Sequence, residues 1–114
     1  MEKYTREING ETYVAVLISN GFGAGWSTWN PVSATDGDFI EFLLENAEID
    51  KSYEYEWEVY IDKVLVEDYY NGRDIYCGGV DGFEIHWLKE GTRFYIKEYD
   101  GRESIETQNY FQTA

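Results

Sequence analysis

Hydrophobic and polar positions alternate in several short stretches of the chain, and such alternation predicts β-strands. The first long apolar stretch, ETYVAVLIS at residues 11–19, follows the dipeptide Asn9-Gly10. Asn-Gly is a strong signal for a two-residue hairpin turn, because both central residues of a type I′ turn need a positive φ. The sequence therefore predicts an N-terminal hairpin formed by residues 4–8 and 11–19.

A helical spacing follows between residues 38 and 46. Apolar side chains recur there at intervals of three and four residues, and a capping side chain is available just before them at Thr35, Asp36 or Asp38. Residues 51–70, KSYEYEWEVYIDKVLVEDYY, fit both a strand pattern and a helix pattern. A strand of that length would far exceed the usual five or six residues, so length favours a second helix.

The C-terminal third has the pattern of a meander of short strands. The predicted strands are residues 74–77, 83–88, 93–99 and 103–107, separated by pairs that contain glycine. Phe83, Ile85 and Trp87 would share one face of the sheet, with Glu84 and His86 on the other. We therefore expect one α+β domain over residues 1–114, with an antiparallel sheet of N-terminal hairpin plus C-terminal meander and two helices packed on it.

Composition and charge narrow the function. The 114 residues are 43% hydrophobic and 18% aromatic, which is enough apolar material for a packed core. The chain has 23 acidic and 9 basic residues, so its formal net charge is -14. Direct binding of nucleic acid is therefore not expected. One cysteine and no signal for secretion or membrane insertion indicate an intracellular protein.

The acidic residues crowd the two predicted helical segments. Glutamates four residues apart on a helix repel each other, and a surface that serves solubility alone normally mixes both signs. Either the surface is merely acidic, or its negative field attracts a basic partner. The residues predicted to bind that partner are Glu41, Glu45, Glu54, Glu58, Asp62, Glu67 and Asp68.

The stretch GFGAGWSTWNP at residues 21–31 follows the second predicted strand and partly matches the dinucleotide fingerprint G-x-G-x-x-G. Trp26 stands where the third glycine is required, so the pattern does not predict a phosphate site. We expect a flexible corner that buries Trp26 or Trp29 against the sheet. The alternative is that one of these tryptophans is exposed and anchors a protein partner.

Candidate metal ligands are few. Cys77 and His86 lie on neighbouring predicted strands, and a zinc site would need Asp74, Asp81 or Glu84 to complete it. A buried free cysteine and a surface histidine are the alternative. The chain has none of the nucleophile, zinc-protease or phosphate-loop motifs, so we expect no enzyme.

Three segments resemble small proteins encoded by bacteriophages and prophages. They are GFGAGWSTWN, CGGVDGFEIHWLKEGTRF and EYDGRESIET, which occur in that order. Small acidic phage proteins are in turn similar to anti-defence proteins, including anti-CRISPR inhibitors that occupy the basic surface of an RNA-guided nuclease. This resemblance implies an inhibitor that acts in the host bacterial cytoplasm on a basic nucleic-acid-binding protein of the CRISPR effector class. The rivals are a small zinc-binding domain and a phage accessory or structural protein without a host target.

Overall fold

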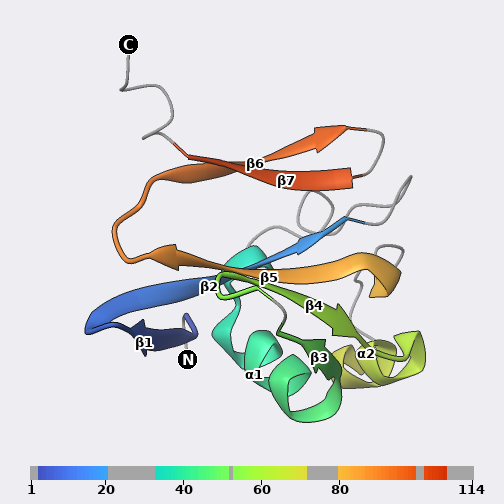
Figure 1. Cartoon of the computed structure of the whole chain (residues 1–114). Helices are drawn as coiled ribbons and strands as arrows, with labels where there is room; N and C mark the ends of the chain where they lie inside the picture. Colours follow the sequence, from blue (N-terminus) through green and yellow to red (C-terminus); the bar gives the residue numbers. More distant parts are fainter. Residues whose placement is uncertain (1–2, 21–32, 52, 72–79, 100–101, 108–114) are drawn as a thin grey trace.

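A five-stranded antiparallel sheet carries both helices on one face, as Figure 1 shows. The computed structural model describes residues 3–20, 33–51, 53–71, 80–99 and 102–107. In the order in which they lie side by side, the strands are β1 (Thr5–Ile8), β2 (Glu11–Ser19), β5 (Phe83–Lys89), β4 (Glu56–Tyr60) and β3 (Glu48–Asp50). The strands β6 (Phe94–Tyr99) and β7 (Arg102–Thr107) form a separate two-stranded sheet. The α+β prediction is confirmed.

The N-terminal hairpin is confirmed together with its turn. Asn9 and Gly10 both have positive φ, at 53° and 81°, as a type I′ turn requires. The turn sets the register in which Ile8 lies opposite Glu11 and Thr5 lies opposite Val14. Burial along β2 increases toward Ser19, so its second half enters the core.

The first predicted helix is confirmed as α1 (Gly37–Asn46). The Asp36 carboxylate caps it by accepting hydrogen bonds from the backbone N–H groups of Asp38 and Phe39, at 3.1 and 3.3 Å. The side chains of Phe39, Ile40 and Leu43 are fully buried against the sheet. A short 3₁₀ turn, Ser33–Thr35, precedes the helix.

The single helix predicted over residues 51–70 is wrong, because two elements share that stretch. Residues 56–60 form β4, in which Trp57 and Val59 are buried and their neighbours are exposed. The helix α2 (Lys63–Tyr70) begins only after Asp62, whose carboxylate caps it by accepting a hydrogen bond from Val64 N–H at 2.9 Å. The run is long because it contains a strand and a capped helix, with only Ile61 between the end of β4 and the cap Asp62.

The C-terminal meander is correct in its described strands and wrong in their pairing. The strand β5 follows a 3₁₀ turn, Val80–Gly82, and lies between β2 and β4. Among the described strands of the predicted meander, only β6 and β7 pair with each other. The predicted strand at residues 74–77 and the corner with Trp26 and Trp29 lie outside the described residues.

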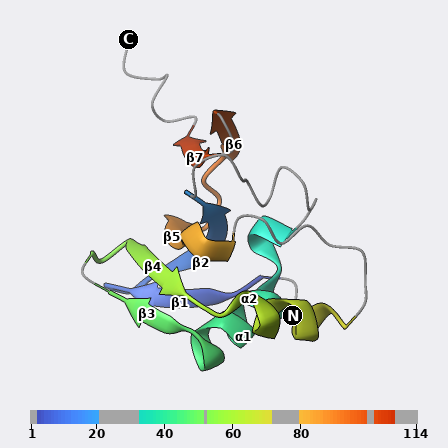
Figure 2. The same cartoon turned by 90° about the vertical axis from the view of Figure 1, so that its right-hand side faces the viewer.

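The sheet has two faces of different character. The face toward α1 and α2 supplies Leu17, Phe83, Ile85 and Val59 to the core, where each is at most 1% exposed. Figures 1 and 2 show the β6–β7 hairpin on the opposite side of the sheet from the helices. We call that opposite side the outer face, and it carries the candidate site.

Candidate functional site

The β6–β7 hairpin covers only part of the outer face. Val16 and Ile18 of β2 point to this face, and they are 0% and 2% exposed. Glu103 of β7 is also buried, and its carboxylate accepts a hydrogen bond of 2.9 Å from the backbone N–H of Ser19. The hairpin is therefore fixed over β2, and the half of the outer face toward β4 and β3 is open, with Glu84 and His86 of β5 half-buried beside the hairpin.

Carboxylates gather on this open half. Because strand residues alternate between faces, the buried positions Trp57, Val59 and Ile85 leave their neighbours on the outer side. We define the acidic sheet face by the five carboxylates that the three strands place there, which are Glu48, Asp50, Glu56, Glu58 and Glu84.

Like charges lie directly opposite each other on the acidic sheet face. Glu58 of β4 is the cross-strand partner of Asp50 on one side and of Glu84 on the other. Like charges in this position destabilise a sheet by roughly 0.2–1 kcal/mol for each pair. The arrangement therefore lowers the stability of the fold while it concentrates negative charge at one place.

His86 is the basic group within this row. Its Nε2 lies 2.9 Å from Glu84 Oε1, and its Nδ1 lies 3.8 Å from Glu56 Oε1. The hydrogen bond with His86 holds the pKa of the Glu84 carboxyl below its usual value, although burial works in the opposite direction. Asn20 contributes to the same lowering through a hydrogen bond of 3.2 Å from Nδ2 to Glu84 Oε2. Glu84 is thus held as a carboxylate.

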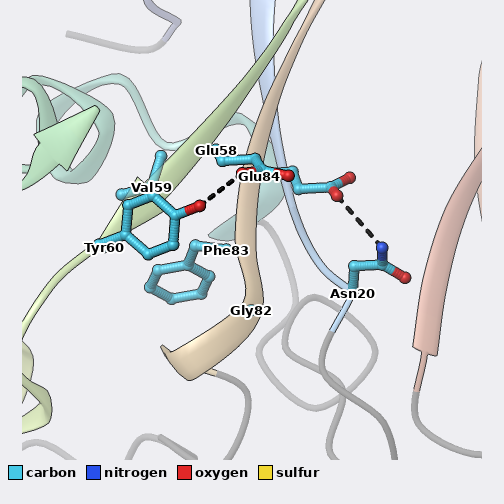
Figure 3. A pocket seen from close by; sticks show the side chains of 7 residues that line it. All are labelled: Asn20, Glu58, Val59, Tyr60, Gly82, Phe83 and Glu84. Carbon is cyan, nitrogen blue, oxygen red and sulfur yellow. Dashed lines mark hydrogen bonds between the residues drawn. The ribbon is translucent and has the colours of Figure 1, made fainter. Parts of the chain in front are cut away.

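A shallow hollow of about 190 Å³ lies along the acidic sheet face, between the ends of β4 and β5. Figure 3 shows Glu58 and Glu84 along it, with the Tyr60 hydroxyl donating a hydrogen bond to the Glu58 carboxylate. This bond raises the pKa of Tyr60, so the phenol remains a neutral donor at physiological pH. The Tyr60 side chain is 49% exposed, which leaves one large aromatic surface among the charges.

The structure divides the predicted partner-binding residues between two sides of the molecule. Glu41 and Glu45 lie on α1, and Glu67 and Asp68 lie on α2. Glu58 lies on the outer face, beyond the sheet from both helices. The other two residues lie outside the helices and strands. Glu54 lies in the bend before β4, and Asp62 is the N-terminal cap of α2. The seven residues therefore do not form one surface.

Of the five residues of the acidic sheet face, the sequence predicts only Glu58 as a partner-binding residue, and it offers Glu84 only as a possible zinc ligand. The available signal is the alternation of Glu54, Glu56 and Glu58 with aromatic and apolar residues, which predicts a strand, whereas the length of the run favours a helix. The approach of Glu84 and Asp50 to Glu58 depends on strand pairing between distant segments. No local pattern contains that information.

Of the predicted zinc ligands, only His86 and Glu84 have described side chains. Cys77 and Asp74 lie outside the described residues, as does the side chain of Asp81. Within the described ranges, no group of three or more His, Cys, Asp or Glu side chains is arranged to hold a metal ion. The described part of the chain also contains no helix with the length and apolar character needed to cross a membrane.

Comparison of the chain with protein families, with curated proteins and with solved structures finds no match.

Proposed function

We propose that this domain is a stoichiometric protein inhibitor that places its acidic sheet face on the nucleic-acid-binding surface of a host RNA-guided nuclease. The observation that carries the proposal is the position of Glu58 directly between Asp50 and Glu84. A folded protein gains no stability from that row. A basic partner would relieve the repulsion among these three carboxylates. We therefore infer that they bind a partner and do not serve solubility alone.

The charge of the molecule suits such a target. RNA-guided nucleases hold the guide and its target in positively charged channels and contact the nucleic-acid backbone rather than its sequence. A domain with a formal net charge of -14 would be attracted to these channels over a long range, which raises the association rate more than the affinity. In keeping with its resemblance to phage proteins, the domain would act in the host bacterial cytoplasm.

Affinity requires a contact that excludes water, and Tyr60 supplies one. Tyrosine is enriched among the residues that dominate binding energy, because its ring buries area while its hydroxyl keeps a partner. Tyr60 stands beside the hollow and next to Glu58. We propose that the ring is the anchor and that the carboxylates around it select a basic surface.

The test is inhibition of programmed DNA cleavage by a panel of RNA-guided nucleases, with the domain added before or after loading of guide and target. One variant reverses Glu48, Glu56 and Glu58 to Lys on the sheet face. The matched control reverses Glu45, Glu67 and Asp68 to Lys on the two helices, so its net charge changes by the same amount. All six positions are exposed, and exposed substitutions usually change stability by less than about 0.5 kcal/mol. At Glu58 any larger change should be stabilising, because reversal removes the repulsion from Asp50 and Glu84.

We expect inhibition by the parent and by the helix variant, and its loss in the sheet-face variant while circular dichroism shows both variants folded. Equal loss in both variants would mean that only total charge matters, which contradicts a defined binding face. No inhibition by the parent across the panel, with no basic protein captured from host lysate, would refute the inhibitor proposal.

A further inference from the structure

A second cavity lies on the helix side of the sheet, away from the acidic sheet face. Its volume is about 420 Å³, which falls in the range of small-molecule sites. Part of its wall is apolar and comes from Leu44, Ala47 and Ile49, at the end of α1 and the start of β3. The rest is aromatic and cationic, and consists of Tyr4, Arg6, Lys51, Trp57 and Trp87.

The cations of this cavity stack on its indole rings. The Arg6 guanidinium carbon lies 4.4 Å from the ring centroid of Trp57 and 4.5 Å from that of Trp87. Lys51 Nζ lies 4.8 Å from the ring centroid of Trp57. Contact with the electron-rich ring faces holds both cations in place without neutralising them.

Neither cation is paired with a carboxylate of the residues that the structure describes. Among the described residues, no Asp or Glu oxygen lies within ion-pair distance of Arg6 or Lys51, whereas Lys63 and Lys89 have glutamate partners at 3.9 and 3.1 Å. The Arg6 Nη2 group instead donates a hydrogen bond to the backbone carbonyl of Glu54. Arg6 and Lys51 are thus two cations that line the same cavity without a described carboxylate partner.

The same place holds polar atoms that the fold leaves unsatisfied. Arg6 Nε and Trp87 Nε1 are buried and have no hydrogen-bond partner within the described part of the chain, and Trp87 is only 3% exposed. Burial of such donors costs stability. Desolvation also lowers the pKa of the Arg6 guanidinium, against the effect of the nearby Glu54 and Tyr55, but an arginine stays charged at physiological pH.

We propose that this cavity binds a small organic anion, with its carboxylate or phosphate group at Arg6 and Lys51 and its apolar body against Leu44, Ala47 and Ile49. The net charge of -14 does not prevent this. Charges more than about 8 Å from the site are largely screened at physiological ionic strength, whereas contacts inside the cavity are screened less. The site is independent of the proposed inhibitor function, because it lies on the other side of the sheet.

The probes are benzoate and phenyl phosphate, with benzyl alcohol as the neutral analogue and inorganic phosphate as the head group alone. Isothermal titration calorimetry at 0.15 M salt gives the affinity, and the fluorescence of Trp57 and Trp87 reports on the cavity. We expect saturable binding of at least one organic anion below about 10 mM. Benzyl alcohol and inorganic phosphate should bind much more weakly, because each lacks half of the contacts.

Three variants separate electrostatic from structural effects. Lys51→Gln should weaken anion binding about fivefold, because one opposite charge at contact distance is lost. Glu54→Gln should tighten binding about twofold, because a nearby negative charge is removed. Lys89→Gln is the matched control and should have no effect, since Lys89 pairs with Glu11 outside the cavity. Ala47→Leu should abolish binding of the organic anions by filling the apolar end.

Several results would overturn the proposal. Binding of benzyl alcohol as tight as that of benzoate would show an apolar hollow in which the cations play no part. Equal affinities of the Lys51→Gln and Lys89→Gln variants for the organic anions would likewise show that the cations of the cavity play no part in binding. If neither organic anion saturates the parent protein, Arg6 and Lys51 serve only to cover the indole rings.

Discussion

The acidic sheet face makes a prediction about stability that does not require the partner. Glu58→Gln removes one charge from a row in which Asp50 and Glu84 lie directly opposite it. Glutamine has nearly the same shape, and its side-chain oxygen can still accept the Tyr60 hydroxyl. The substitution therefore isolates the effect of charge, and we expect it to stabilise the protein.

The magnitude follows from the two cross-strand pairs. Each like-charged pair costs roughly 0.2–1 kcal/mol, so the gain should be about 0.5–1 kcal/mol at low ionic strength after allowance for exposure to solvent. For a domain of 114 residues this corresponds to an increase in Tm of a few degrees, roughly 2–6 °C. Because the Debye length falls to about 3 Å in 1 M salt, the gain should largely disappear there.

Urea denaturation at low and at high salt measures this effect. Glu7→Gln is the matched control, because Glu7 is an exposed strand glutamate whose cross-strand neighbour is Thr12 rather than a carboxylate. We expect the unfolding free energy of the control to stay within about 0.3 kcal/mol of the parent. A neutral or destabilising Glu58→Gln at low salt, or a gain that persists in 1 M salt, would refute the repulsive row.

Three further predictions concern the fold around the site. Phe39→Ala should cost about 3–5 kcal/mol in thermal or urea unfolding, because Phe39 is fully buried and its ring contacts Phe83 and Tyr70; a cost below about 1 kcal/mol would contradict the packing. Glu103→Ala should destabilise by about 1–3 kcal/mol and increase hydrogen exchange at Ser19 N–H, whereas Glu103→Gln keeps an acceptor and should lose less. Because its folded pKa is lowered, Glu84 contributes stability above its ordinary pKa near 4.5 that is lost as pH falls through the lower folded value. The parent should therefore lose more stability than Glu84→Gln between about pH 5 and pH 3, and parallel pH profiles would exclude this role.

Local signals account for the parts of the fold that the sequence predicted. Asn9-Gly10 specifies its turn through backbone conformation alone, and Asp36 specifies the start of α1 by accepting hydrogen bonds from backbone N–H groups two and three residues further along the chain. The second capping residue, Asp62, carried the same kind of signal within residues 51–70. A cap at Asp62 divides the run into a helix after it and a strand before it, and this local signal outweighs the length of the run.

The site was less predictable because it is assembled from distant segments. Glu58 and Glu84 are 26 positions apart, and only the insertion of β5 between β2 and β4 brings them opposite each other. The cavity with Arg6 likewise combines β1, β4 and β5. The charge composition predicts a negatively charged surface that attracts a basic partner. Which carboxylates share a face, however, is decided by strand pairing.

The most direct test of the proposed function is the association rate constant between the domain and an RNA-guided nuclease that it inhibits, measured by surface plasmon resonance as a function of salt. We predict a rate that falls steeply with salt, because the attraction is long-range. The Glu48, Glu56 and Glu58 reversal should slow association strongly, and the Glu45, Glu67 and Asp68 reversal should slow it much less. A salt-independent rate, or equal slowing by the two reversals, would contradict the acidic sheet face as the docking surface.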